Sequence, residues 1–208
     1  MEETILNDAL KLPTAGDGRR IGLFGGSFNP PHEGHLNVTE LALKRLELDQ
    51  VWWIVSPGNP LKDHSELAGL EKRVALCQEL ADDPRVKITA FEASYNTRYT
   101  ADTLRLVTKL RPRLDFVWLM GADNLADFHK WQDWRDIAHM MPIAVVDRPG
   151  STLAFHSAPA ALALSAYRID EYDASLLADK KPPAWTFIHG PRNSISSTKL
   201  RNAQTRNK

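Results

Sequence analysis

Two histidines, His32 and His35, lie three positions apart in the stretch GLFGGSFNPPHEGHL, which spans residues 22–36. Residues three apart share one face of a helix, so both imidazole rings are expected to point to the same place. The glycine pair Gly25-Gly26 precedes them and lets a backbone approach a ligand closely or adopt a positive φ. A helix N-terminus adds unpaired N–H groups and a positive dipole end. The stretch therefore predicts a site for a phosphate-bearing ligand.

The glycine pair does not match two common nucleotide-binding motifs. No third glycine falls at the spacing of the dinucleotide-binding fingerprint, and no Gly-Lys-Ser/Thr sequence forms a phosphate loop. A zinc site is the alternative interpretation of His32 and His35, but no third His, Cys or Glu ligand follows at a recognisable spacing. The sequence therefore indicates no metal bound by the protein's own side chains.

The elements that must position these residues are apolar runs alternating with amphipathic stretches. The runs that predict buried strands are RIGLFGG (20–26), QVWWIVSP (50–57), RVKITAFE (85–92), LDFVWLMGAD (114–123), MPIAVVDRPG (141–150) and AWTFIHG (184–190). The stretches that predict helices are residues 33–48, 70–83, 100–112 and 196–204. Strands that alternate with helices predict the α/β class, a Rossmann-like three-layer sandwich with a parallel sheet and helices on both faces. Ligands of such sheets bind beyond the carboxyl ends of the strands.

The composition predicts a single domain without a membrane span. The 26 Lys and Arg balance the 26 Asp and Glu, so a general nucleic-acid binder is not favoured, and no apolar run is long enough to cross a membrane. Cys77 is the one cysteine, which fits a reducing, cytoplasmic compartment, and it is interpreted as a small apolar residue on a helix face. Residues 1–20 lack the features of a signal peptide and are expected to form a polar, weakly ordered leader before one domain at 21–208.

Several motifs together resemble one enzyme family. GGSFNPPHEGHL is similar to the His-x-Gly-His element of the nucleotidyltransferase superfamily, and ISSTKLR (195–201) is similar to its second signature. Within the superfamily, PGNPLK, YTADTL, MGADNLADFHKWQDW and VVDRPG resemble the bacterial nicotinate-nucleotide adenylyltransferases. The resemblance covers about residues 21–201. It implies adenylyl transfer from ATP to nicotinate mononucleotide in NAD biosynthesis, with release of pyrophosphate and no covalent intermediate on the enzyme.

The resemblance also implies a set of ATP-binding residues. They are Gly25, Gly26, Ser27, Phe28, His32, His35, Asp123, Arg148, Ser196, Ser197, Thr198 and Arg201. Among them, His32, His35 and Arg201 are implied to be catalytic, through contacts with the ATP phosphates. Helix capping is an alternative interpretation for Asp123 and for the hydroxyl residues 196–198. Mg²⁺ is expected because it travels with ATP phosphates and keeps most of its own waters.

A second implied set of residues binds the mononucleotide. They are Asn59, Lys62, Tyr99, Thr100 and Trp131. Trp131 would stack on the nicotinate ring, although aromatic residues at the spacing of Trp131 and Trp134 are more often core residues. Backbone N–H groups near Thr100 would bind the nicotinate carboxylate and select the acid over the amide, and Thr100 could also cap the following helix. Lys62 could equally be a solvated surface residue, because NPLK is altered and shorter than the family's Asn-Pro-Pro-His run.

Other interpretations stay open at this point. Nicotinamide-mononucleotide and pantetheine-phosphate adenylyltransferases belong to the same superfamily, and a non-catalytic nucleotide-sensing module is a different class. The intact histidine and Ser-Ser-Thr-x-x-Arg elements argue against the sensing module. The expected partners are small-molecule substrates, with no nucleic acid and no membrane. Arg73 matches a basic family position, and residues 151–184 read as either an alanine-rich helix or a Pro-closed loop.

Overall fold

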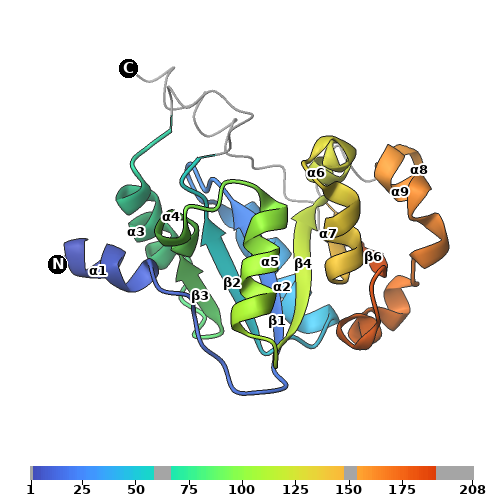
Figure 1. Cartoon of the computed structure of the whole chain (residues 1–208), viewed down its shortest axis with the longest axis horizontal. Helices are drawn as coiled ribbons and strands as arrows, with labels where there is room; N and C mark the ends of the chain where they lie inside the picture. Colours follow the sequence, from blue (N-terminus) through green and yellow to red (C-terminus); the bar gives the residue numbers. More distant parts are fainter. Residues whose placement is uncertain (1, 59–66, 148–153, 191–208) are drawn as a thin grey trace.

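The computed structural model describes residues 2–58, 67–147 and 154–190 (Figure 1). Six strands form one parallel sheet in the order β3-β2-β1-β4-β5-β6. The strands are β1 (Arg20–Gly26), β2 (Gln50–Val55), β3 (Val86–Thr89), β4 (Asp115–Gly121), β5 (Ile143–Val146) and β6 (Trp185–Ile188). Each predicted strand is confirmed, although the predicted ranges 85–92 and 114–123 end in residues that begin helices, and residues 148–150 of the range 141–150 lie outside the described residues. Because β1 pairs with β2 on one side and β4 on the other, the winding of the chain reverses between β1 and β4.

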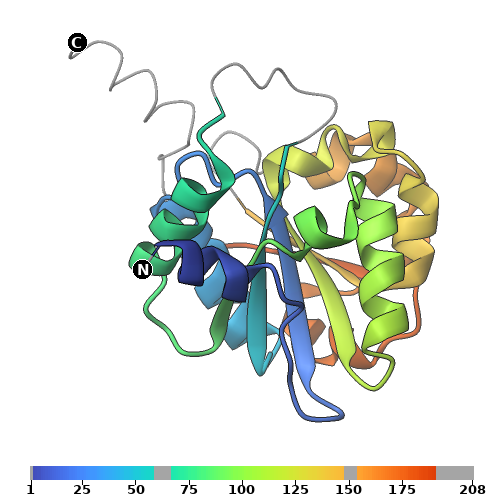
Figure 2. The same ribbon diagram turned by 60° about the vertical axis from the view of Figure 1, so that its left-hand side comes forward.

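Helices cover both faces of the sheet, which confirms the predicted three-layer architecture (Figure 2). The helices that pack on one face are α4 (Phe91–Tyr95), α5 (Thr100–Leu110), α6 (Ala122–Leu125), α7 (Trp134–Met140) and α9 (Pro159–Ala163). Those on the other face are α2 (Glu33–Arg45), α3 (Leu70–Leu80) and the 3₁₀ segment η3 (Glu171–Asp179). The described elements also include two further 3₁₀ turns, η1 (Phe128–Lys130) and η2 (Ser165–Tyr167), and the short helix α8 (Ala154–Ser157).

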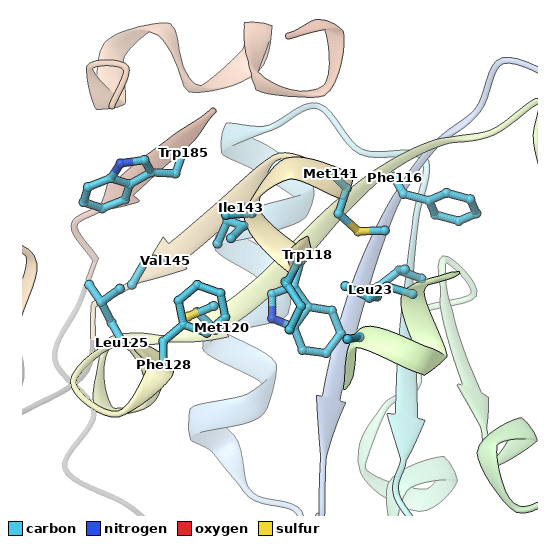
Figure 3. Close-up of a cluster of buried hydrophobic side chains, with 14 of the residues drawn as sticks. Leu23, Phe116, Trp118, Met120, Leu125, Phe128, Met141, Ile143, Val145 and Trp185 are labelled. Carbon is cyan, nitrogen blue, oxygen red and sulfur yellow. The ribbon is translucent and has the colours of Figure 1, made fainter. Parts of the chain in front are cut away.

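The two cores follow from the alternation of side chains along each strand. In β1, Leu23 packs in the core beneath α5 and α7, whereas the next residue, Phe24, packs in the core beneath α2. Trp52 and Trp53 divide between the two cores in the same way. Trp118 of β4 lies in the middle of the first core, beside Leu23 and Met120, with Phe128 nearby (Figure 3). Such fully apolar strands are typical of a parallel sheet buried on both faces.

The N-terminal segment differs from the expected weakly ordered leader. Residues Glu2–Ala9 form α1, which packs against α3, and the Ala9 carbonyl accepts hydrogen bonds from the backbone N–H of Ala90 (2.7 Å) and the Thr89 hydroxyl (3.0 Å). Ala9 and Leu12 are buried, because these apolar positions in a mostly polar stretch cover β3 at the edge of the sheet. The expectation of weak order was therefore wrong for this part of the segment, and the domain boundary at residue 20 stays a prediction.

Two further sequence interpretations can be compared with the structure. Residues 154–179 contain several short helical segments, so neither a single alanine-rich helix nor a loop describes them fully. Cys77 is completely buried on α3, and burial raises the pKa of its thiol to about 12, which confirms its interpretation as an apolar residue. The helix predicted at 196–204 lies outside the described residues. Within the described part of the chain, no helix has the length and apolar character needed to span a membrane.

Candidate active site

A pocket opens at the carboxyl ends of β1, β2 and β4, where the winding of the sheet reverses. Its walls come from the turn after β1, the turn after β2, the α4–α5 connection and the segment from β4 to η1. The lining residues are Gly25, Gly26, Ser27, Ser56, Gly58, Glu92, Arg98, Tyr99, Thr100, Trp118, Asn124, Trp131 and Gln132. The structure thus brings the predicted ATP-binding glycine turn together with Tyr99, Thr100 and Trp131, which the sequence places about 75 to 105 positions further along the chain.

His32 and His35 form a reciprocal cap at the start of α2. His32 is the N-cap residue, and its Nδ1 accepts a hydrogen bond from the Gly34 backbone N–H at 3.0 Å. The His35 Nδ1 in turn accepts one from the His32 backbone N–H at 3.1 Å, and the two ring centroids lie 4.0 Å apart. The prediction that both rings lie together is confirmed, although His32 precedes the helix, so a shared helix face is not the cause. This is a capping box in which imidazoles take the place of the usual Ser or Thr and Glu.

The cap also selects the tautomer of each ring. An Nδ1 atom that accepts an N–H cannot carry a proton, so the neutral ring holds its proton on Nε2. His32 and His35 are 6 % and 8 % exposed, and they lie in the same β1–α2 connection as Ser27. Neither ring is among the residues that line the pocket. The arrangement therefore places the Nδ1 atoms of both rings in the cap at the N-terminal end of α2, in the connection that also forms one wall of the pocket.

Phe28 supports this pair from the core. Its ring stacks on Trp53 at a centroid distance of 4.9 Å and lies 4.8 Å from the His35 ring. The Trp53 indole N–H donates to the Thr39 hydroxyl, which donates to the His35 carbonyl. Phe28 is a predicted ATP-binding residue, but its side chain is buried in the core, so in this structure only its backbone lies in the connection.

The Gly25 position is explained by packing against an aromatic ring. A Cβ atom on Gly25 would lie 2.7 Å from the Cη2 atom of Trp118, which is closer than real Cβ contacts. Neither Gly25 nor Gly26 has a positive φ, since the described glycines that do are Gly18 and Gly58. A positive φ is therefore not the reason for glycine at residue 25, where the close approach of the Trp118 ring leaves no room for a Cβ atom.

Arg73 connects the loops on two sides of the pocket. Its guanidinium donates to the carbonyls of Ser27 (2.8 Å), Ser56 (2.7 Å) and Ala68 (2.8 Å). The residue is 1 % exposed, and burial lowers its pKa. Arg73 thus links the turns after β1 and β2 to each other and to the segment that leads into α3. Its position on the apolar side of α3, four residues before the buried Cys77, was the sequence signal for this role.

Helix α4 and the α4–α5 connection contribute one charged residue each to the pocket, Glu92 and Arg98, which the sequence interpretation did not include. Glu92 is 9 % exposed, and its Oε1 accepts a hydrogen bond from the Thr103 hydroxyl at 2.6 Å. Burial outweighs this bond and raises the pKa of Glu92 to about 7. Arg98 lies on the same wall with an exposed side chain. Tyr99 is the N-cap of α5, so the capping interpretation for Thr100 was wrong.

Trp131 belongs to both the core and the pocket. Its ring meets Trp118 and Phe128 edge-on, at centroid distances of 6.5 Å and 5.4 Å, and it also lines the pocket. Trp134 packs against Phe128 and does not line the pocket. Core support and exposure to a ligand are therefore compatible at Trp131.

Asp123 lies in α6 with an exposed side chain, and its neighbour Asn124 lines the pocket. Gly121 is the N-cap of α6, so the capping interpretation for Asp123 was wrong. The remaining predicted site residues lie outside the described residues; they are Asn59, Lys62, Arg148, Ser196, Ser197, Thr198 and Arg201. Among the residues that the structure describes, no three His, Cys, Asp or Glu side chains form a group that could hold a metal ion.

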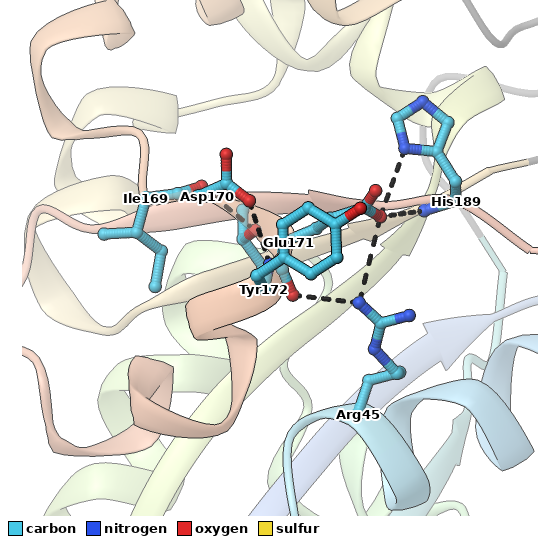
Figure 4. Close-up of polar contacts among 7 residues, drawn as sticks. Arg45, Ile169, Asp170, Glu171, Tyr172 and His189 are labelled. Atoms are coloured by element: carbon cyan, nitrogen blue, oxygen red, sulfur yellow. Dashed lines mark hydrogen bonds and ion pairs between the residues drawn. The ribbon is translucent and has the colours of Figure 1, made fainter.

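A polar cluster fixes the end of β6, just before the second signature motif (Figure 4). The Glu171 Oε2 accepts a hydrogen bond from the backbone N–H of His189 (3.0 Å) and lies 3.1 Å from the Nδ1 atom of the same residue. Arg45 donates a hydrogen bond to the Glu171 carbonyl (3.0 Å). Partial burial acts to raise the pKa of Glu171, but the contacts with His189 and the charge of Arg45 outweigh it and lower the pKa. The cluster thus ties the exit of β6 to α2, the helix that His32 caps.

Comparison with known proteins gives a consistent result. The cytidylyltransferase-like family matches residues 23–203. The probable nicotinate-nucleotide adenylyltransferase of Agrobacterium fabrum is 62% identical over 182 residues, which cover 88% of this chain and 97% of that protein. Its counterpart of the same name in Brucella suis is 60% identical over 184 residues, covering 88% of this chain and 95% of that protein.

A similar fold is found among solved structures. The structure of Plasmodium falciparum nicotinic acid mononucleotide adenylyltransferase complexed with NaAD superposes with a TM-score of 0.66 at 19% sequence identity, covering 88% of this chain and 83% of that one. At this identity the likeness supports the fold, while the bacterial relatives support the family. The chain belongs to the nicotinate-nucleotide adenylyltransferase family, within the cytidylyltransferase-like proteins.

Proposed function

We propose that this protein transfers the adenylyl group of ATP to nicotinate mononucleotide, forming nicotinate adenine dinucleotide and pyrophosphate in NAD (pyridine nucleotide) biosynthesis. The observation that carries the proposal is the pocket at the reversal of the sheet, whose walls combine a glycine turn with Tyr99, Thr100 and Trp131. One part of this pocket suits phosphates and the other suits a flat ring. The relatives that match nearly the whole chain have the corresponding activity in their names.

The chemistry requires positioning and neutralisation of charge. A phosphate oxygen of the mononucleotide attacks the α-phosphorus of ATP in line, a new P–O bond forms, and the bond to the pyrophosphate oxygen breaks. The acceptor phosphate is already a nucleophile, so the reaction needs neither a covalent enzyme intermediate nor a dedicated base. The Nε2–H groups of His32 and His35 would donate to the ATP phosphates where negative charge increases. Arg201 and the hydroxyls of residues 196–198 are the proposed second group of phosphate contacts.

The remaining roles divide between the two substrates. Gly25, Gly26 and Ser27 would contact ATP through the turn after β1, and Asp123 and Arg148 are proposed to lie at its adenosine. Trp131 would stack on the nicotinate ring. The first N–H groups of α5, beside Tyr99 and Thr100, would face its carboxylate, and Asn59 and Lys62 are proposed for the mononucleotide as well.

ATP-using nucleotidyltransferases generally require a divalent cation, and we propose Mg²⁺. It would be held by the ATP phosphates and water, which suits the preference of this ion for oxygen ligands and its reluctance to lose its waters. A cytoplasmic location is part of the proposal, because ATP is the donor and the lone cysteine fits a reducing compartment.

The experiment is pyrophosphate release with ATP, Mg²⁺ and one acceptor at a time. Nicotinate mononucleotide is expected to give turnover well above that with nicotinamide mononucleotide or phosphopantetheine. Equal turnover with the two pyridine mononucleotides would keep the adenylyl transfer and reject the preference for the acid. Turnover with phosphopantetheine alone would reject the proposed acceptor, and binding of ATP without turnover on any acceptor would favour a nucleotide-sensing module.

A further inference from the structure

Among the described residues that line the pocket, Arg98 is the only one with a basic side chain. It makes no hydrogen bond or ion pair with any part of the chain that the structure describes. Several other arginines with exposed side chains have carboxylate partners. These pairs include Arg19 with Asp49, Arg85 with Asp83, Arg105 with Asp102, Asp133 and Asp136, and Arg113 with Asp17. The pocket thus contains a positive charge that the described protein does not neutralise.

The surroundings of Arg98 favour an anion from outside. Arg98 directly precedes Tyr99, the N-cap of the 11-residue helix α5, whose first N–H groups add to the positive potential. Glu92 is the carboxyl group of the described pocket wall, and it pairs with the Thr103 hydroxyl rather than with Arg98. Because burial favours the neutral form of Glu92 and raises its pKa to about 7, this carboxyl is only partly ionised near neutral pH and offsets only part of the Arg98 charge.

The position of Arg98 within the pocket indicates which anion it meets. The glycine turn after β1 and the capped histidines belong to one connection, which suits the phosphates. Arg98 belongs to the α4–α5 connection, together with Tyr99 and Thr100, and α5 packs against α7, which follows Trp131. The ring end of the substrate is expected at this wall, and a carboxylate is the anionic group that a nicotinate ring carries.

We propose that Arg98 binds the carboxylate of the pyridine ring and thereby selects nicotinate mononucleotide over its amide counterpart. The inference rests on the proposed function. A guanidinium presents paired N–H donors that match a carboxylate in two parallel hydrogen bonds. A carboxamide has no charge and places an NH₂ donor opposite one of those donors, so it gains less from Arg98.

The test compares both mononucleotides in wild type, Arg98→Ala and Arg98→Lys. With nicotinate mononucleotide, kcat/KM of Arg98→Ala is expected to fall roughly 10- to 100-fold, the range for losing a hydrogen bond to a charged group. With nicotinamide mononucleotide, it is expected to change less than about threefold, so the preference for the acid shrinks. Arg98→Lys keeps the charge and loses the paired donors, so an intermediate preference is expected. Arg113→Ala removes an exposed, ion-paired arginine that does not line the pocket, and it should leave both substrates unchanged.

The thermal midpoint of Arg98→Ala is expected to match wild type, because the Arg98 side chain is exposed and makes no hydrogen bond or ion pair with the described residues. Dissociation constants from tryptophan fluorescence, measured with each mononucleotide alone, give a second readout of the same preference. An equal loss for acid and amide would overturn the inference, since it would place Arg98 at a group that both substrates share. If Arg98→Ala keeps the wild-type preference for the acid over the amide, the role of Arg98 is rejected and the proposed function still stands. A wild-type enzyme that does not use nicotinate mononucleotide would reject the proposed function and this inference with it.

Discussion

The backbone N–H of His32 donates to the Nδ1 of His35 at 3.1 Å, and this bond assigns one ring nitrogen of His35 to the start of α2. The Nδ1 atom satisfies an N–H at the start of α2 that no intrahelical carbonyl can reach. The Nε2 atom then carries the proton of the neutral ring and is the proposed donor to phosphate. In the proposed mechanism, structure and activity depend on different atoms of the same side chain, so different substitutions should separate them.

His35→Asn keeps an acceptor near the position of Nδ1 and removes the Nε2–H donor. We expect kcat/KM for pyrophosphate release to fall by roughly 10²–10³, the cost of one preorganised donor, while the cap hydrogen bond is kept and the ring packing against Phe28 and His32 is lost. His35→Gln tests the reverse, because its amide group lies near the position of Nε2 and no longer accepts the hydrogen bond from the His32 backbone N–H. It is expected to lose about 0.5–2 kcal/mol of stability and to keep more activity. Activity assays and urea unfolding of both variants check this, and turnover near wild type in His35→Asn would contradict the assigned donor.

Gly25→Ala tests whether the turn after β1 is glycine because of Trp118. The added Cβ would lie 2.7 Å from the Trp118 ring, which is buried and in contact with Trp131. The ring must shift, so we expect a loss of about 1–3 kcal/mol in the free energy of unfolding and a higher KM for the mononucleotide. Gly16→Ala is the matched control, because a Cβ there has no atom within 4 Å. Equal behaviour of the two variants in denaturant unfolding would show that the Trp118 contact does not restrict residue 25.

Arg73→Met tests the link between the loops after β1 and β2. The change removes the donor from the carbonyls of Ser27, Ser56 and Ala68 while roughly keeping the length of the side chain. We expect the free energy of unfolding to fall by roughly 2–4 kcal/mol, because acceptors that lose their partner cost about 1–3 kcal/mol each when water does not reach them. KM for ATP should rise as the Ser27 turn loosens.

Arg85→Met is the control for Arg73→Met, since Arg85 pairs with Asp83 on the surface. An exposed ion pair of this kind adds little to stability, because solvent screens the two charges. Similar unfolding free energies for both methionine variants would contradict the structural role of Arg73.

The sequence was sufficient to predict the strands of the sheet and the α/β fold class. The six strands are continuous apolar runs, and this pattern is a property of residues close together in the chain. The proximity of His32 to His35 could be predicted for the same reason, since it depends on local geometry. The family motifs then supplied the proposed roles, which neither periodicity nor composition contains.

What the sequence could not supply depends on distant partners. Whether Arg98 has a carboxylate beside it depends on where several acidic residues end up after folding. Glu92 has an unremarkable sequence context, and its raised pKa arises from burial beside Thr103 in another helix. The covering of β3 by Ala9 and Leu12 joins segments about 80 residues apart, so it could not be inferred from a polar N-terminal composition.

Glu92 gives the protein a stability that depends on pH near neutrality. Its pKa rises from an ordinary 4.5 to about 7 on folding, so the folded state holds this proton more tightly than the unfolded state. The proton on Glu92 therefore stabilises the folded state fully below about pH 4.5, and this stabilisation is lost as the pH rises through about 7. At about 1.4 kcal/mol for each pKa unit, the free energy of unfolding falls by roughly 3 kcal/mol between pH 4.5 and 8 through Glu92.

Glu92→Gln keeps an acceptor for the Thr103 hydroxyl and cannot ionise, so its free energy of unfolding should fall less than that of wild type over this range. Denaturant unfolding of both proteins at a series of pH values isolates Glu92, because all other groups titrate alike in the pair. Parallel stability profiles would contradict a buried Glu92 that is neutral at the lower pH.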